Sequence, residues 1–128
     1  MRVLFDTHIV LALLGDVLEK EYPRMASRLL DPATVSFVSV ATLWEMAIKT
    51  RLGKLDPGMP LEDISGHLEE FGVTILSIEP SHVLTAADPE PATRDPFDRL
   101  LLAQCQVEGL KLATVDRALA HHHLALKA

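Results

Sequence analysis

The sequence predicts an α/β domain in which a mostly parallel central sheet is covered by helices on both faces. Short β-rich runs alternate with helical segments, and Pro and Gly divide the chain at short intervals, which is typical of βαβ units. The 128 residues are 48% apolar and 23% charged, which fits one compact domain with a full core. We therefore expect a single domain over residues 1–128.

The strands are expected where short apolar or β-branched runs are bounded by turn residues. The first of these runs ends at Asp6, and the fourth ends at Asp116. The predicted strands are residues 2–5, 35–38, 73–78 and 111–115, with a weaker terminal candidate at 124–126.

Helix signals fill the intervals between the strands in the first half of the chain. A short helix is expected at residues 8–14. Residues 17–30 should form two helical pieces or one kinked helix, because Pro23 removes a backbone donor inside the run. After the second strand, Ser39 is expected to cap a helix that ends near Gly53.

The second half of the chain carries the clearest helix. It opens at Asp95-Pro96 and stops before Gly109, and apolar residues recur along it with helical spacing. An earlier helix at 61–71 should begin at Pro60 and stop at Gly72. Two shorter helices are predicted at residues 81–87 and within residues 117–128.

Composition and charge exclude several classes of protein. The net charge of −6, from 18 acidic and 12 basic residues, argues against nucleic-acid binding through a broad basic surface. The single cysteine, Cys105, cannot form an internal disulfide or a cysteine-rich zinc module, and we expect it in the core. No apolar run approaches the roughly 18 residues of a membrane helix, and no signal peptide fits, so a cytoplasmic location is expected.

Four carboxylates map to one edge of the predicted sheet. Asp6 and Asp116 follow the first and fourth strands, Asp98 lies in the first turn of its helix, and Glu45 lies in the second turn of the helix after the second strand. The carboxyl ends of parallel strands, and the helix starts that follow them, share the edge where ligands bind. We therefore expect these side chains to meet despite their long sequence separations.

Each acid also has a purely structural explanation. Asp98 lies three residues after Asp95, so the pair could be an N-cap and its reciprocal capping-box acid. Asp6 and Asp116 could be turn residues that bond to their own backbone. Glu45 could pair on the helix surface with the lysine four residues later, although its apolar neighbours indicate burial and hence the need for a partner.

The four acids together are more specific than any one of them. Converging carboxylates repel one another, and each raises the pKa of the others unless a cation neutralises them. Oxygen ligands without His or Cys at matched spacing select Mg²⁺ or Mn²⁺ over zinc. One or two such ions activate water for phosphodiester hydrolysis. The set therefore predicts a metal-dependent nuclease site.

Other polar residues carry weaker signals. His121, His122 and His123 cannot all face one centre and are expected at the surface end of a helix. His8 either contacts substrate or is a packed or capping residue in the strand-to-helix turn. The sequence contains no recognisable nucleophile–base triad and no Gly-rich phosphate loop. Six basic residues form either a solvated face or a set of phosphate contacts around the metal. They are Lys49, Arg51, Lys54, Arg94, Arg99 and Arg117.

Five segments, in this order along the chain, resemble those of the PIN-domain family and, within it, of the VapC-type toxins of toxin–antitoxin pairs. The resemblance covers nearly the whole chain. It implies a three-layer α/β/α PIN-like domain with a mostly parallel sheet. The segments are Leu4–His8, Ser39–Lys49, Arg51–Leu55, Arg94–Leu101 and Ala113–Asp116.

The resemblance implies a Mg²⁺-dependent endoribonuclease, with Mn²⁺ as a substitute ion, that acts as a toxin. It further implies a homodimer and a cognate antitoxin that inserts into or covers the acidic groove. Thr114 and Asp95 become accessory residues, while Thr93 departs from relatives in which a His often precedes the Arg-Asp-Pro-Phe-Asp run. The catalytic and metal-binding set implied by the resemblance is Asp6, Glu45, Asp98 and Asp116.

Two other functions compete with this one. A phosphoacceptor receiver domain has a similar length and strand order, but here the third strand ends in Glu79-Pro80 instead of the expected Asp. A catalytically silent PIN-like module that only binds RNA or protein would usually have lost one or more of the acids. This chain has all four.

Overall fold

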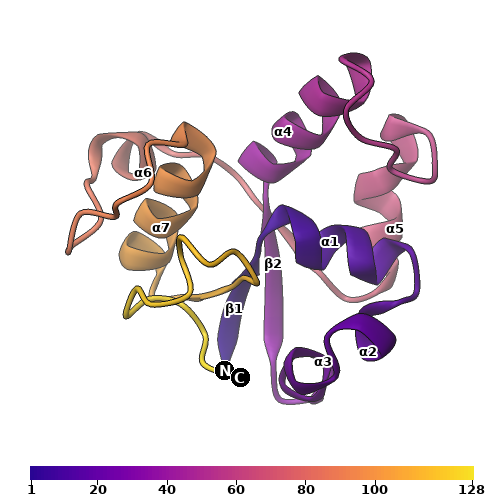
Figure 1. Ribbon diagram of the computed structural model, residues 1–128, viewed down its shortest axis with the longest axis horizontal. Helices are drawn as coiled ribbons and strands as arrows, with labels where there is room; N and C mark the ends of the chain where they lie inside the picture. Colours follow the sequence, from indigo (N-terminus) through magenta and orange to yellow (C-terminus); the bar gives the residue numbers. More distant parts are fainter.

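A computed structural model describes all 128 residues and places a sheet of four parallel strands at the centre of the molecule, and Figure 1 shows its two middle strands there. The strands follow the order β3-β2-β1-β4, and each neighbouring pair is parallel. Helices cover both faces of this sheet, which confirms the predicted three-layer α/β/α class. The strands are β1 (Arg2–Phe5), β2 (Val35–Ser39), β3 (Thr74–Leu76) and β4 (Lys111–Ala113).

The helix ends follow the predicted local signals. The Ser39 side chain accepts a hydrogen bond from the Ala41 N–H at the start of α4, and Gly109 ends α7 with the positive φ of 70° that favours glycine. Pro23 separates two helices, as predicted. The helices are α1 (Thr7–Leu14), α2 (Leu18–Glu21), α3 (Pro23–Leu29), α4 (Val40–Arg51), α5 (Ile64–Glu70), α6 (Pro80–Leu84) and α7 (Pro96–Glu108), with a 3₁₀ turn, η1 (Leu61–Asp63), before α5.

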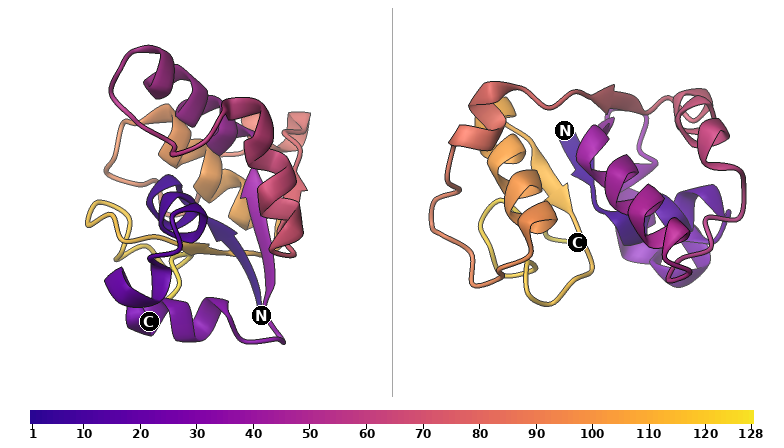
Figure 2. Two further views of the ribbon diagram at one scale, coloured as in Figure 1. Left: turned by 90° about the vertical axis from the view of Figure 1, so that its right-hand side faces the viewer. Right: turned by 90° about the horizontal axis from the view of Figure 1, so that it is seen from above.

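The alternation of side chains along β1 divides the core into two halves. Val3 and Phe5 are buried on the face covered by α1, α3 and α5, whereas Leu4 is buried on the other face with Leu102 and Cys105 of α7. Figure 2 shows the two groups of helices on opposite sides of the strands. Because both faces are covered, the exposed edge at the carboxyl ends of the strands is left for the site.

The strands on the sheet edges and one helix are shorter than predicted. The third strand covers Thr74–Leu76 instead of 73–78, and the fourth covers Lys111–Ala113 instead of 111–115. The fourth strand ends early because Thr114 Oγ1 accepts a hydrogen bond from the Asp116 N–H at 3.0 Å and turns the chain out of the sheet. The helix predicted at 81–87 is α6, which begins at Pro80 instead.

The predicted helix within residues 117–128 is absent. This segment forms turns, with the N–H groups of Leu119 and Ala120 donating to the Asp116 carbonyl. The terminal strand at 124–126 is reduced to one parallel bridge between Leu112 and Ala125. The last helix of the structure is therefore α7.

None of the helices has the length and apolar character that spanning a membrane requires.

Candidate active site

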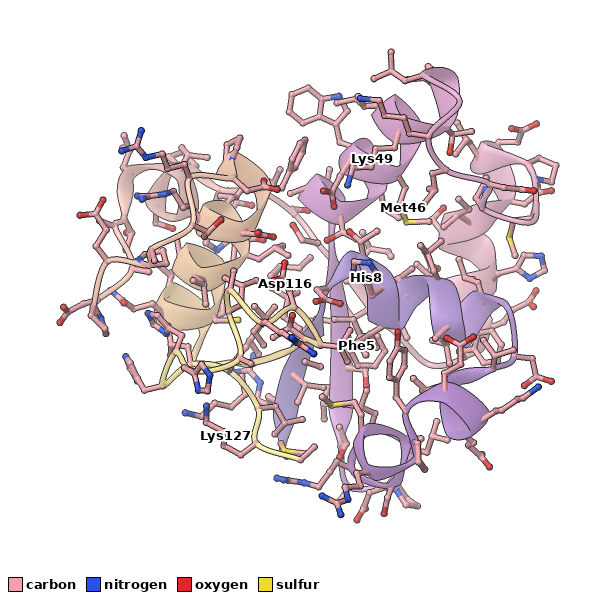
Figure 3. All side chains as sticks on the ribbon, viewed as in Figure 1. Phe5, His8, Met46, Lys49, Asp116 and Lys127 are labelled. Carbon is pink, nitrogen blue, oxygen red and sulfur yellow. The ribbon has the colours of Figure 1, made fainter.

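Five carboxylates surround one pocket of about 120 Å³ at the carboxyl ends of β1, β2 and β4. His8, Lys49 and Asp116 lie around it where α1, α4 and the segment after β4 approach one another (Figure 3). We call it the acid pocket. Its lining is Asp6, Thr7, His8, Leu11, Glu45, Lys49, Leu55, Asp95, Asp98, Leu101 and Asp116. The structure thus brings together the four acids expected at this edge.

Asp6 links the end of β1 to the start of α1. Its Oδ1 accepts a hydrogen bond from the Ile9 N–H at 3.1 Å, and its side chain is the N-cap of the helix. Only 5% of the residue is exposed. Burial raises the pKa of Asp6, while hydrogen bonds from the Thr114 side chain and the Ile9 N–H oppose the rise. Asp6 is therefore both a cap and a pocket acid.

Glu45 reaches the acid pocket from the middle of α4 and is buried. The Thr7 hydroxyl donates a hydrogen bond to its Oε1, and the Lys49 ammonium lies 3.2 Å from its Oε2. The expected lysine pair is therefore present, but it lies inside the pocket lining. These two partners compensate the burial of the Glu45 charge.

The start of α7 separates the roles of Asp95 and Asp98. Asp95 Oδ1 accepts hydrogen bonds from the N–H groups of Phe97 at 2.8 Å and of Asp98 at 3.4 Å, so Asp95 is the N-cap. The explanation of Asp98 as the reciprocal capping-box acid is wrong. The Asp95 N–H donates instead to Thr93 Oγ1 at 3.2 Å, which leaves the Asp98 carboxylate facing the pocket.

The pKa of Asp98 is raised by its burial and by the other acids of the pocket. Burial raises it most, and repulsion from the other four pocket carboxylates raises it further, to about 6. The Thr93 hydroxyl donates a hydrogen bond to Asp98 Oδ2 at 3.5 Å. A cation bound among these groups would relieve the repulsion.

Asp116 lies in the turn after β4. Its Oδ1 accepts a hydrogen bond from the Ala118 N–H at 2.8 Å, and its own N–H donates to Thr114 Oγ1. Asp116 is thus the turn residue that its position suggested, and it also lines the acid pocket. Thr114 is buried beside it and contacts Asp6 as well.

The donors of the acid pocket fit a hard divalent cation in their chemistry, because they are carboxylate oxygens in a small, partly buried cavity. No three His, Cys, Asp or Glu side chains of the chain are close enough to one another to hold a metal ion as they stand. Glu45 is engaged by Thr7 and Lys49. Occupation of the pocket would therefore require these side chains to turn toward a shared centre.

The predicted phosphate contacts fall into three groups. Lys49 lines the acid pocket. Arg99 directs its guanidinium into its own chain, at Glu90, Pro91 and Thr93, instead of into the pocket. The other four residues are exposed and lie outside the pocket lining: Arg51, Lys54, Arg94 and Arg117.

The remaining polar candidates are also located. His8 is exposed and lines the pocket, so the packed position expected as one alternative is wrong. His122 and His123 bond to the carbonyl oxygens of Pro89 and Asp88 at the surface, in turns and not at a helix end. Cys105 is in the core, and burial raises its pKa to about 12, which removes it as a nucleophile.

Two threonines at the site were not among the sequence candidates for a catalytic role. Thr7 follows the first acid and bonds to Glu45, while Thr93 contacts both Asp95 and Asp98. The available signal was their position next to acids at two helix starts, where hydroxyls commonly bond to nearby groups.

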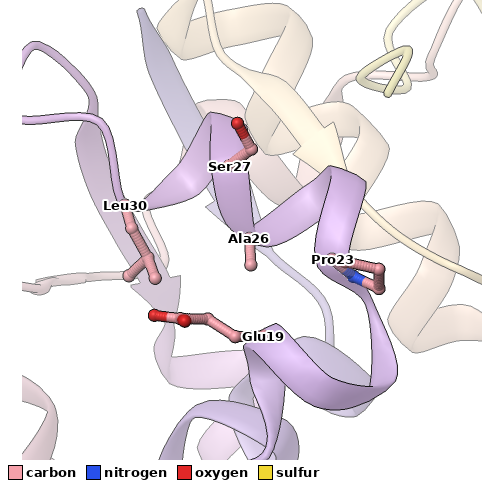
Figure 4. Close-up of a pocket in the computed structure, with 5 residues that line it drawn as sticks. All are labelled: Glu19, Pro23, Ala26, Ser27 and Leu30. Atoms are coloured by element: carbon pink, nitrogen blue, oxygen red, sulfur yellow. The ribbon is translucent and has the colours of Figure 1, made fainter.

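A larger hollow of about 310 Å³ lies between α2 and α3 (Figure 4). Its lining contains one carboxylate, Glu19, and otherwise Pro23, Ala26, Ser27 and Leu30. Because Glu19 is its only titratable group, the hollow lacks the second group that acid–base catalysis or ion binding would need. The acid pocket, with its five carboxylates, is therefore the candidate active site.

Comparison with curated proteins gives no significant match. The family model described as "PIN domain" matches residues 3–123, and this span includes all five pocket carboxylates and the complete parallel sheet. The chain therefore belongs to the PIN domain family, which includes nucleases.

Proposed function

We propose that this chain is a Mg²⁺- or Mn²⁺-dependent endoribonuclease that acts as the toxin of a toxin–antitoxin pair. The observation that supports the proposal most is the convergence of Asp6, Glu45, Asp98 and Asp116 on one pocket at the carboxyl edge of a parallel sheet. Family membership supports the nuclease class. The only cysteine is buried, so no thiol competes as the nucleophile.

In this proposal Asp6, Asp98 and Asp116 hold the cation, and Glu45 completes its ligand set or orients the attacking water. When bound, Mg²⁺ or Mn²⁺ supplies Lewis-acid polarisation of the phosphate and lowers the pKa of water. Lys49 lies in the pocket lining beside Glu45 and is placed to pair with a phosphate oxygen. Without the ion, burial and the other pocket acids raise the pKa of Asp98 to about 6, and a bound cation would favour its ionised form.

The proposed partners are RNA, a second copy of the chain and an antitoxin. A homodimer is supported by exposed apolar residues on α4 and at its C-cap, namely Val40 at 39%, Trp44 at 60% and Leu52 at 63%. An antitoxin that covers the acid pocket with basic side chains would find complementary charge there. The four exposed basic residues outside the lining, Arg51, Lys54, Arg94 and Arg117, remain predicted phosphate contacts.

Cleavage of structured RNA tests the enzymatic part of the proposal. The purified protein should cut with Mg²⁺ or Mn²⁺ and stop in EDTA, and Asp6→Asn should be inactive. Sequencing of new 5′ ends after brief induction in bacteria would identify the target. Undiminished cleavage in EDTA would refute the metal-dependent mechanism, and specific RNA binding without cleavage would favour the silent PIN-like module.

Growth measurements test the toxin part separately. Expression should arrest a bacterial host, and co-expression of a small protein encoded beside it should restore growth. Normal growth at high expression, with wild type and Asp6→Asn indistinguishable, would contradict the toxin role even if the enzyme cuts RNA in vitro.

A further inference from the structure

Arg99 uses its whole guanidinium group within its own chain. Its Nε donates to the Thr93 carbonyl oxygen at 2.7 Å, and its Nη2 donates to the Pro91 carbonyl oxygen at 3.2 Å. Its Nη1 lies 2.8 Å from Glu90 Oε1. The planar guanidinium presents donors in a fixed fork, so these contacts define the position of the loop relative to α7.

The loop held by Arg99 leads directly to the acid pocket. The Thr93 hydroxyl accepts a hydrogen bond from the Asp95 N–H at 3.2 Å and lies 3.5 Å from Asp98 Oδ2. Thr93 therefore touches the N-cap residue and one of the pocket acids. Arg99 fixes the backbone of Thr93, and Thr93 in turn contacts Asp98.

The rest of this loop shows why Arg99 matters for its position. The first part is held elsewhere, with Asp88 and Pro89 bonded to His123 and His122. Residues 90–94 form neither helix nor strand, and their backbone carbonyls at Pro91 and Thr93 are bonded by Arg99. The Glu90 carboxylate is 73% exposed, so its ion pair adds little by itself. The loop is therefore restrained mainly by the two hydrogen bonds from Arg99 to backbone carbonyl oxygens.

We propose that Arg99 is a positioning residue of the proposed nuclease, which holds Thr93 against Asp98 so that this carboxylate faces the acid pocket, and that it does not bind the RNA phosphate. This inference rests on the proposed function. It assigns to Arg99 a role different from the one that its position beside an acid suggested. The consequence is that Arg99 affects turnover and ion binding more than affinity for RNA.

The kinetic test compares Arg99→Gln and Arg99→Lys with wild type. We expect kcat to fall about tenfold or more in both, because a small displacement of a catalytic group is costly, while KM and its salt dependence stay unchanged. Arg24→Gln removes the same charge from an exposed site on α3 and should match wild type in kcat. A raised KM with a weaker salt dependence and an unchanged kcat in Arg99→Gln would show a phosphate contact and overturn the proposal.

A double-mutant cycle tests whether Arg99 acts through Thr93. Thr93→Val should lower kcat, Thr93→Ser should restore it because the hydroxyl is kept, and Arg99→Gln combined with Thr93→Val should be no slower than the slower single variant. Fully additive losses would show that the two residues act independently, which contradicts the proposal that Arg99 acts through Thr93.

Two measurements do not depend on activity. In Arg99→Gln, amide hydrogen exchange across residues 90–95 should be about tenfold faster, and the rise in melting temperature on adding Mn²⁺ should be smaller than in wild type or Arg24→Gln. Unchanged exchange and an unchanged Mn²⁺ response would overturn the role of Arg99 even in an active enzyme. Absence of RNA cleavage in wild type would instead refute the proposed function, and the exchange result would still decide whether Arg99 holds Thr93.

Discussion

The hydroxyl of Thr7 donates a hydrogen bond to the carboxylate of Glu45, and this contact joins the first turn of α1 to the middle of α4. Both residues line the acid pocket, so the bond restrains Glu45, the pocket acid that lies in the middle of a helix. Lys49 restrains the other carboxylate oxygen from the same helix. The orientation of Glu45 is therefore set by two neighbours before any ligand arrives.

Thr7→Val should weaken both the fold and the site. It keeps the side-chain shape but removes the hydroxyl that bonds to a buried carboxylate, so we expect a loss of about 2 kcal/mol in the free energy of unfolding. RNA cleavage should fall as well, because Glu45 loses its restraint. Urea unfolding and a cleavage assay measure the two effects. Thr7→Ser should behave like wild type, and an equally large loss in that control would show that the methyl group, not the hydroxyl, matters.

Asp95 is the N-cap of α7 and also places a carboxylate in the lining of the acid pocket. Two substitutions separate these contributions. Asp95→Asn keeps an oxygen that can accept from the Phe97 N–H, whereas Asp95→Ala removes it. Asp95→Ala should therefore cost about 1 kcal/mol, and Asp95→Asn should cost less. Both should keep partial activity. Thermal melting distinguishes them, and complete inactivity of the stable Asp95→Asn variant would show that the carboxylate itself is needed for chemistry.

Features of the fold that depend on residues close in sequence were predictable. The helix starts at Ser39 and Asp95 were found because a cap bonds to amide groups two or three residues later. The meeting of Asp6, Glu45, Asp98 and Asp116 was found for a different reason. A parallel sheet brings its carboxyl ends to one edge, so the topology alone predicted that these four acids would meet there.

Features that depend on a loop conformation were not predictable. An arginine next to Asp98 gives the same pattern whether it binds RNA or its own loop, and only the path of residues 90–93 shows that Arg99 does the latter. The end of β4 shows the same limit. The apolar run continues to Val115, but the Thr114 hydroxyl takes the Asp116 N–H and ends the strand after Ala113.

His82 is a buried polar residue whose role is confined to the fold. Its Nδ1 accepts a hydrogen bond from the Glu79 N–H at 2.9 Å, so Nε2 carries the proton and donates to Glu108 Oε1, also at 2.9 Å. His82→Phe should cost about 2 kcal/mol in urea unfolding, because the Glu79 N–H loses its acceptor and the bond to Glu108 is lost as well. Glu108→Gln keeps an acceptor oxygen and should cost less. Neither residue lines the acid pocket, so an altered kcat in His82→Phe would contradict this division between fold and site.

Asp98→Asn should make the metal-free protein more stable at neutral pH. The folded-state pKa of Asp98 is raised from 3.8 to about 6 by burial and then by the neighbouring carboxylates. Between these two values the folded state holds more protons than the unfolded state, so this carboxyl lowers wild-type stability as pH rises through that window. The stability advantage of Asp98→Asn should therefore be near zero at pH 3 and complete by pH 7.

The expected advantage is about 1 kcal/mol at pH 7, since solvent screens the charge of this half-buried group. Urea unfolding at several pH values, with the exposed α5 control Glu69→Gln, measures it. With Mn²⁺ present the order should reverse, because wild type gains stability from ion binding that Asp98→Asn has lost. If Asp98→Asn were less stable without metal and still gained the full Mn²⁺ stabilisation, Asp98 would serve the fold and not the ion site.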